Sequence, residues 1–310
     1  VVECEFGAGC SHRLSLVLRV CNNSLKSVKF TNNLMGGQRL VEIIEALSLH
    51  PQLEQVNFWR INIERSECIQ LAALVHHTSE IHTLALCNTG IDDEGVDVLL
   101  GAITNSGLSV LDLSSNQITA RGCQSLAALL ENPNCNLEKL FFYQNNIGDE
   151  GAHFFANAMT SNRKLTILNL YDNGITTMGW SGFSKVLCDT SSVNNTYLSN
   201  HTLESLGVMT GNECGALLTL LALNRSSENK KHVALRKILK HHQHFDMKPF
   251  FEWELKVLPT AVSWFERARS LEDIYGRAID KQKLSVIYQF IRAMPEVFEP
   301  APAAVGQMGE

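Results

Sequence analysis

Histidine and cysteine side chains form the groups in this sequence that could bind a metal ion or act as nucleophiles. The candidate groups are His241, His242 and His244; His76 and His77; and Cys4, Cys10, His12 and Cys21. None of them has the ligand spacing of a zinc site, which indicates packing or surface residues instead. Cys87 is a conceivable reactive thiol, but it has no basic neighbour in sequence that would lower its pKa. We therefore predict neither a metal nor another cofactor.

Motifs of familiar enzymes are also missing. The sequence contains no G-x-x-x-x-G-K-[ST] loop, no G-x-S-x-G elbow and no H-E-x-x-H pair. We therefore predict a non-enzymatic protein without a small-molecule substrate. One basic stretch, residues 230–245, holds five Lys or Arg and four His and could contact an acidic protein, nucleic acid or a membrane surface. The alternative is the solvated face of a helix whose Val233, Ile238 and Leu239 point inward.

Composition narrows the class of partner. The 310 residues are 45% hydrophobic with a net charge of -6, which argues for a folded chain and against a general nucleic-acid binder. No apolar stretch is long enough for a membrane span. Nine cysteines without paired spacing favour reduced thiols and a cytoplasmic location. Sequons at Asn22, Asn194, Asn200 and Asn224 leave a secreted glycoprotein as the alternative. Because the first residue is Val, we expect that sequence could precede it.

A repeat of about 28 residues organises most of the chain. Its template is L-x-x-L-x-L-x-x-N-x-I-x-x-x-G-x-x-x-L-x-x-x-L, and its copies begin at Leu25, Leu53, Ile81, Leu108, Leu137, Leu165 and Val193. Apolar residues at the first, fourth and sixth positions predict a short strand, because side chains alternate between the two faces of a strand. Apolar residues four apart after the glycine predict a helix. Each copy therefore reads as a strand, a turn and a helix.

Polar residues fill defined places in the turns. The template asparagines, which can satisfy backbone groups at the end of each strand, would stack as a ladder of Asn33, Asn116, Asn145 and Asn173. Acidic residues stand where helix N-termini favour negative charge: Asp93, Glu94, Asp149 and Glu150. Some copies depart from the template, with Ile61, Thr89 and His201 in place of Asn, and Arg39 and Glu67 in place of Gly. One copy cannot fold alone, so neighbouring copies must stack.

This period, with its helices on the outer side, resembles the ribonuclease-inhibitor class of leucine-rich repeats, which Ran GTPase-activating proteins and the sensor tails of NOD-like receptors share. The resemblance covers about residues 14–212. It implies an α/β leucine-rich-repeat solenoid, a horseshoe with parallel strands on the concave face and helices on the convex face. We expect a partial repeat at 1–24, seven repeats at 25–212, a helical cap or appendage at 213–298 and a disordered tail at 299–310. The amino-acid sequence of the expected C-terminal helices resembles the tails of uncharacterised algal repeat proteins.

The outward strand positions of the concave face form the candidate binding site. Five of these 21 positions are aromatic, an excess typical of protein interfaces. The aromatic residues are Trp59, Phe141, Tyr143, Tyr171 and Tyr197, with Asp112, Lys139 and Asn169 as polar partners. The alternative is that the aromatic rings stack on one another across adjacent strands and only stabilise the sheet.

Three functions are compatible with this pattern. The first is a monomeric scaffold that binds a protein partner on the concave face. The resemblance also allows a Ran-type GTPase-activating protein, or the sensor tail of a NOD-like receptor. The repeats alone do not separate these functions, because a fold does not determine a function.

Overall fold

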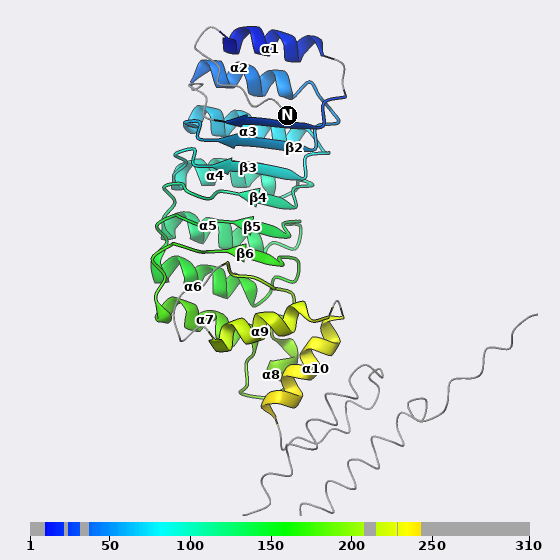
Figure 1. The fold of residues 1–310 in the computed structure, drawn as a ribbon, viewed down its shortest axis with the longest axis vertical. Helices are drawn as coiled ribbons and strands as arrows, with labels where there is room; N and C mark the ends of the chain where they lie inside the picture. The colour runs from blue at the N-terminus through cyan, green and yellow to red at the C-terminus, as the bar shows by residue number, and fades with distance from the viewer. Residues whose placement is uncertain (1–9, 22–23, 32–36, 208–214, 228, 243–310) are drawn as a thin grey trace, which may run out of the picture. The chain divides into compact units, whose positions relative to one another are not determined.

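The computed structural model describes residues 10–21, 24–31, 37–207, 215–227 and 229–242 (Figure 1). They belong to two compact units, Val1–Asp189 with Ser199–Ser226, and Thr190–Leu198 with Ser227–Glu310. The part of the predicted helical cap or appendage beyond residue 242 and the predicted tail at 299–310 lie outside the described residues.

In the first unit, helices and strands alternate along the chain. The elements are α1 (Cys10–Val20), β1 (Ser27–Thr31), α2 (Gln38–Leu47), β2 (Gln55–Trp59), α3 (Arg65–His77), β3 (Thr83–Cys87), α4 (Asp93–Ile103), β4 (Val110–Asp112), α5 (Ala120–Glu131), β5 (Lys139–Phe141), α6 (Gly148–Met159), β6 (Ile167–Asn169), α7 (Thr177–Leu187) and α9 (Gly215–Arg225). The strands form one parallel sheet in chain order, β1 to β6. Figure 1 shows them stacked in one layer and the helices in a second. The predicted α/β leucine-rich-repeat solenoid is confirmed.

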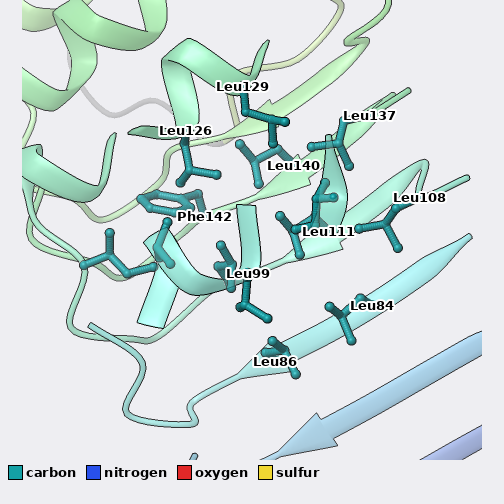
Figure 2. Close-up of a cluster of buried hydrophobic side chains, with 14 of the residues drawn as sticks. Leu84, Leu86, Leu99, Leu108, Leu111, Leu126, Leu129, Leu137, Leu140 and Phe142 are labelled. Carbon is teal, nitrogen blue, oxygen red and sulfur yellow. The ribbon is translucent and has the colours of Figure 1, made fainter. Parts of the chain in front are cut away.

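The core lies between the sheet and the helices. Strand residues at the fourth and sixth template positions point inward, and Leu84, Leu111 and Leu140 are fully buried. Figure 2 shows them in one continuous cluster with Leu99 of α4 and Leu126 of α5. Burying one such side chain contributes about 1.5–3 kcal/mol, so each repeat is stabilised by the repeats on both sides of it.

The asparagine ladder forms as predicted at Asn116, Asn145 and Asn173. Asn145 Oδ1 accepts the N–H of Ile118 in the preceding repeat at 3.1 Å, and its Nδ2 donates to the carbonyls of Leu113 and Phe142. Thr89, which replaces the asparagine in one copy, donates its hydroxyl to the carbonyl of Leu86 at 3.0 Å. Asn33 lies outside the described residues.

Two of the acidic residues cap the helix of the next repeat rather than their own. Asp93 Oδ1 accepts the N–H groups of Thr119 and Gly122 at the start of α5, and its Oδ2 accepts the Thr119 hydroxyl. Asp149 makes the same three bonds at the start of α7. A Cβ added at Gly122 would lie 2.5 Å from Asp93 Oδ1, and one at Gly179 would lie 2.5 Å from Asp149 Oδ1, which favours glycine at these two positions.

The departure at Glu67 follows from the same arrangement. Gly37 stands two repeats before Asp93 and has no side chain to reach the start of α3. Glu67 itself supplies the missing acceptor, because its Oε2 takes the N–H of Glu64 at 3.2 Å. In this copy, glutamate at the glycine position supplies the acceptor that the preceding repeat lacks.

The prediction that the seventh copy begins with a strand at Val193 is wrong. Residues Val193–Leu198 form the short helix α8, which packs with α10 (Lys230–His241) in the second unit. The backbone that pairs with β6 comes later, where Ser205 bridges to Ile167 and its carbonyl accepts the N–H of Leu168 at 2.9 Å. The inserted helix moves the last repeat along the chain. In α10, the residues predicted to point inward are buried: Val233, Ile238 and Leu239.

Candidate functional site

The concave face is the face of the sheet turned away from the helices, and its side chains form rows across the strands. The parallel register places Ala85, Asp112, Phe141 and Asn169 in one row, one residue from each of the strands β3 to β6. A second row continues past the strand ends through Trp59, Cys87, Ser114, Tyr143 and Tyr171. All the predicted site residues except Tyr197 lie on this face. Tyr197 belongs to α8, because a helix replaces the strand expected there.

Three side chains of the second row are joined into what we call the rail: Trp59, Cys87 and Tyr143. Trp59 and Cys87 are register partners, and Tyr143 reaches past Ser114 to place its Oη 3.6 Å from Cys87 Sγ. Ser114 is fully buried, and its Oγ has no hydrogen-bond partner. The rail is therefore a preformed strip that crosses the strands.

The rail is uncharged at neutral pH. The hydrogen bond with Cys87, partial burial and the nearby Asp112 charge raise the pKa of Tyr143 to about 12. Burial, followed by the Asp112 charge, raises the pKa of Cys87. Both groups remain protonated at pH 7, so the rail offers aromatic surface and neutral polar atoms.

A row of polar residues borders the rail and was not foreseen from the sequence. Five residues at the eighth template position share a left-handed backbone with φ between 54° and 57°: Arg60, Asn88, Ser115, Gln144 and Asp172. We call them the edge row. None is glycine, although this conformation costs a residue with a side chain about 1–2 kcal/mol. Their backbone N–H groups extend the sheet, as when Ser115 donates to the carbonyl of Tyr143 at 2.7 Å.

Side chains of the edge row contact one another and the rail. The Arg60 guanidinium lies 4.5 Å from the centre of the Trp59 ring, a cation–π contact. Ser115 Oγ donates to Gln144 Oε1 at 2.9 Å, and Gln144 Nε2 donates to Asp172 Oδ2 at 3.3 Å. Five polar residues at one template position were the available sequence signal.

The predicted polar partners are not all brought together. Asp112 Oδ1 accepts the N–H of Ser114 at 2.9 Å, which leaves Asp112 beside the rail. Asn169 Oδ1 accepts the N–H of Tyr171 at 3.2 Å. Lys139 is exposed four residues before Tyr143, about 13 Å away along the strand. Arg60, not Lys139, is the cation next to the aromatic side chains.

The other candidate groups, the histidines and cysteines singled out in the sequence, form no metal site in the part of the chain that the structure describes. No three His, Cys, Asp or Glu side chains there are arranged to hold a metal ion, and Cys4 and His244 fall outside it. The rings of His76 and His77 contact each other edge to face, 5.2 Å apart. None of the described helices is long and apolar enough to cross a bilayer.

Comparison with known proteins gives matches across the repeats. The family model "Leucine Rich repeat" matches residues 104–127, 134–156 and 161–183. NACHT, LRR and PYD domains-containing protein 3 of Rattus norvegicus is 26% identical over 60% of this chain and 18% of its own length. The human protein 13 of the same name is 29% identical over 66% of the chain and 20% of its own length. The ribonuclease inhibitor of Sus scrofa is 26% identical over 60% of the chain and 41% of its own length. The chain thus spans less than half of each relative.

Proposed function

We propose that this chain, a leucine-rich-repeat protein of the ribonuclease-inhibitor-like class, is a non-catalytic scaffold that binds a protein partner on its concave face. The observation that carries the proposal is the rail with its neighbour Tyr171, large aromatic side chains on a surface that the helices do not cover. Tyr171 is 41% exposed. Hot spots of protein interfaces are enriched in such tyrosine and tryptophan side chains.

Ring stacking does not account for these aromatic residues. Among the described residues, aromatic ring pairs occur in the core, as between Phe142 and Phe155, but none joins Trp59, Tyr143 or Tyr171. No described aromatic ring therefore covers Tyr143 or Tyr171, while the Arg60 guanidinium lies over one face of Trp59. The contact between Tyr143 and Cys87 holds one ring in place before binding, which lowers the entropy cost of ordering it in a complex.

The test is a double substitution, Tyr143→Ala with Tyr171→Ala. Hot-spot residues contribute about 2 kcal/mol or more each, so capture of a specific partner should fall at least about 100-fold. Thermal stability should change little, because Tyr143 is half-buried and Tyr171 is exposed. The matched control is Met178→Ala, which removes a side chain that is 68% exposed on α7.

The readout is a quantitative pull-down with the wild-type chain and both variants as bait. Proteins held by the wild type and by Met178→Ala, but lost from the double variant, are concave-face partners. An identical set of proteins on all three baits would remove the concave face from consideration.

A second candidate is the sensor tail of a NOD-like receptor, which the similarity to the NACHT, LRR and PYD domains-containing proteins favours. A coding sequence for a nucleotide-binding module directly upstream of Val1 would support it, and a complete gene without one would exclude it. The Ran-type GTPase-activating function stays a prediction. A GTP hydrolysis assay with a Ran-type GTPase tests it, and no acceleration would eliminate it.

A reducing, cytoplasmic location is the compartment we propose. Cys68 and Cys123 are buried free thiols, and Cys21 is an exposed one. Two sequons point away from glycosylation in this fold, because Asn200 and Asn224 are fully buried and their Nδ2 atoms donate to backbone carbonyls. Asn194 is exposed, so a glycan found there would contradict the proposal.

A further inference from the structure

The edge row carries opposite charges at its two ends. Arg60 follows β2 and Asp172 follows β6, four strands further along the sheet. At about 4.8 Å per strand, their backbones lie about 19 Å apart. Neither side chain forms an ion pair with another described residue. The residues between them are neutral and polar: Asn88, Ser115 and Gln144.

The neighbouring rail gives the same surface an apolar side. Tyr143 reaches past Ser114 to Cys87, so the rail runs across the strands in the same direction as the edge row. A ligand that contacts both rows at once must also cross the strands. Amide and hydroxyl side chains of the edge row can donate to and accept from the backbone of such a ligand.

Asp112 strengthens the negative half of this surface. One of its oxygens accepts the Ser114 N–H, and its charge acts on both Cys87 and Tyr143. The positive end of the surface is therefore Arg60, while Asp112 and Asp172 make the middle and the far end negative. The matching ligand is acidic at one end and basic toward the other.

We propose that the concave face binds an extended peptide segment of its partner, laid across the strands along the rail and the edge row, with an acidic side chain at Arg60 and a basic side chain at Asp112 or Asp172. An extended chain rises about 3.3 Å per residue, so about six residues span the row. This inference rests on the proposed protein-binding function and names the form and charge of the bound segment.

The test uses two synthetic peptides of identical composition and eight residues, both acetylated, amidated and fluorescently labelled. In the segregated peptide two glutamates stand at one end and two lysines at the other, with two Ser, one Tyr and one Val between. In the alternating peptide the four charges alternate along the chain. Fluorescence anisotropy at low salt should show at least tenfold tighter binding of the segregated peptide to the wild-type protein.

Charge reversals on the protein then test the assigned ends. Arg60→Asp should weaken binding of the segregated peptide at least tenfold. Adding Asp172→Arg should restore it, because the peptide then binds in the opposite direction. Arg121→Asp is the matched control, since Arg121 is an exposed arginine on α5, and it should leave binding unchanged. Melting temperatures confirm that each variant is folded.

Several results would overturn the inference. Equal binding of both peptides, no binding of the segregated peptide to the wild type, or no rescue by the double reversal would each do so. If a partner is lost from the Tyr143→Ala, Tyr171→Ala variant but kept by Arg60→Asp, the protein-binding function stands and this peptide inference fails. If the tyrosine substitutions have no effect, the proposed function itself fails.

Discussion

Replacing Asp149 by alanine tests the inter-repeat cap. The substitution removes acceptors for the Thr176 N–H at 2.7 Å, the Thr176 hydroxyl at 2.7 Å and the Gly179 N–H at 3.1 Å. Loss of a helix cap costs about 0.5–2 kcal/mol, and loss of the charge at a helix N-terminus about 0.3–1 kcal/mol. We expect the free energy of unfolding to fall by about 2 kcal/mol at pH 7, from the sum of these two effects.

The pH dependence provides a second, independent readout. The Asp149 carboxylate accepts hydrogen bonds from the Thr176 hydroxyl and from the Thr176 and Gly179 N–H groups. These bonds lower the pKa of Asp149 below the unfolded value of about 3.9. Because the folded pKa is the lower one, the stabilisation is complete above the unfolded pKa and is lost as the pH falls through the folded pKa. The difference between wild type and variant should therefore shrink below about pH 4.

Urea denaturation at pH 7 and at a series of acidic pH values measures both effects. Glu150→Ala is the control, because it removes the same charge from the same first turn of α6 without removing any of these bonds. Equal losses for the two variants, or a difference that does not change with pH, would refute the cap.

Three further predictions concern single positions. Gly179→Ala adds a Cβ 2.5 Å from Asp149 Oδ1 and 2.7 Å from Ile175 Cγ2, so it should destabilise by at least as much as Asp149→Ala, and the double variant should lose less than the sum of the two, as urea denaturation would show. Asn145→Ala removes three side-chain hydrogen bonds to backbone groups of two repeats and should cost about 3 kcal/mol by calorimetry; a loss below about 1 kcal/mol would contradict the ladder. Burial raises the pKa of Cys87, so an alkylating reagent should modify Cys87 more slowly than the exposed Cys21 in a mass-spectrometric time course. Equal rates would contradict the rail.

The repeat period sufficed to predict the fold of the first unit. Leu111 and Leu140 stand at the same template position in their copies. Because every copy has the same alternation of apolar residues and the same turn, both leucines face the core when the copies stack. The same alternation placed Trp59, Tyr143 and Tyr171 on the opposite face. These predictions depend on local periodicity, which the sequence carries directly.

The strand of the seventh copy was predicted wrongly because apolar residues of this segment match the spacing of the template. Val193 and Leu198 stand at the first and sixth template positions, but the segment is helical. The start of the last repeat is marked more reliably by an asparagine three residues before the leucine at the first template position. Asn162 Oδ1 accepts the Leu165 N–H at 2.8 Å, and Asn200 Oδ1 accepts the Leu203 N–H at 2.9 Å.

Contacts between repeats could not be read from single copies. The sequence placed Asp93 at a helix start, but spacing does not say which helix its carboxylate reaches. The reach of Tyr143 to Cys87 joins residues 56 positions apart and depends on a side-chain orientation. The edge row depends on backbone angles, which five different side chains do not reveal.

The aspartate caps make the repeats come in two kinds. The repeats of α4 and α6 each donate a carboxylate, and those of α5 and α7 each receive one through a threonine and a glycine. Deleting one repeat would set two donors or two receivers next to each other, whereas deleting two neighbours would leave the order intact. Such a chain grows or shrinks through evolution most readily by gene segments that encode two repeats, and the same rule applies to engineered versions of different length.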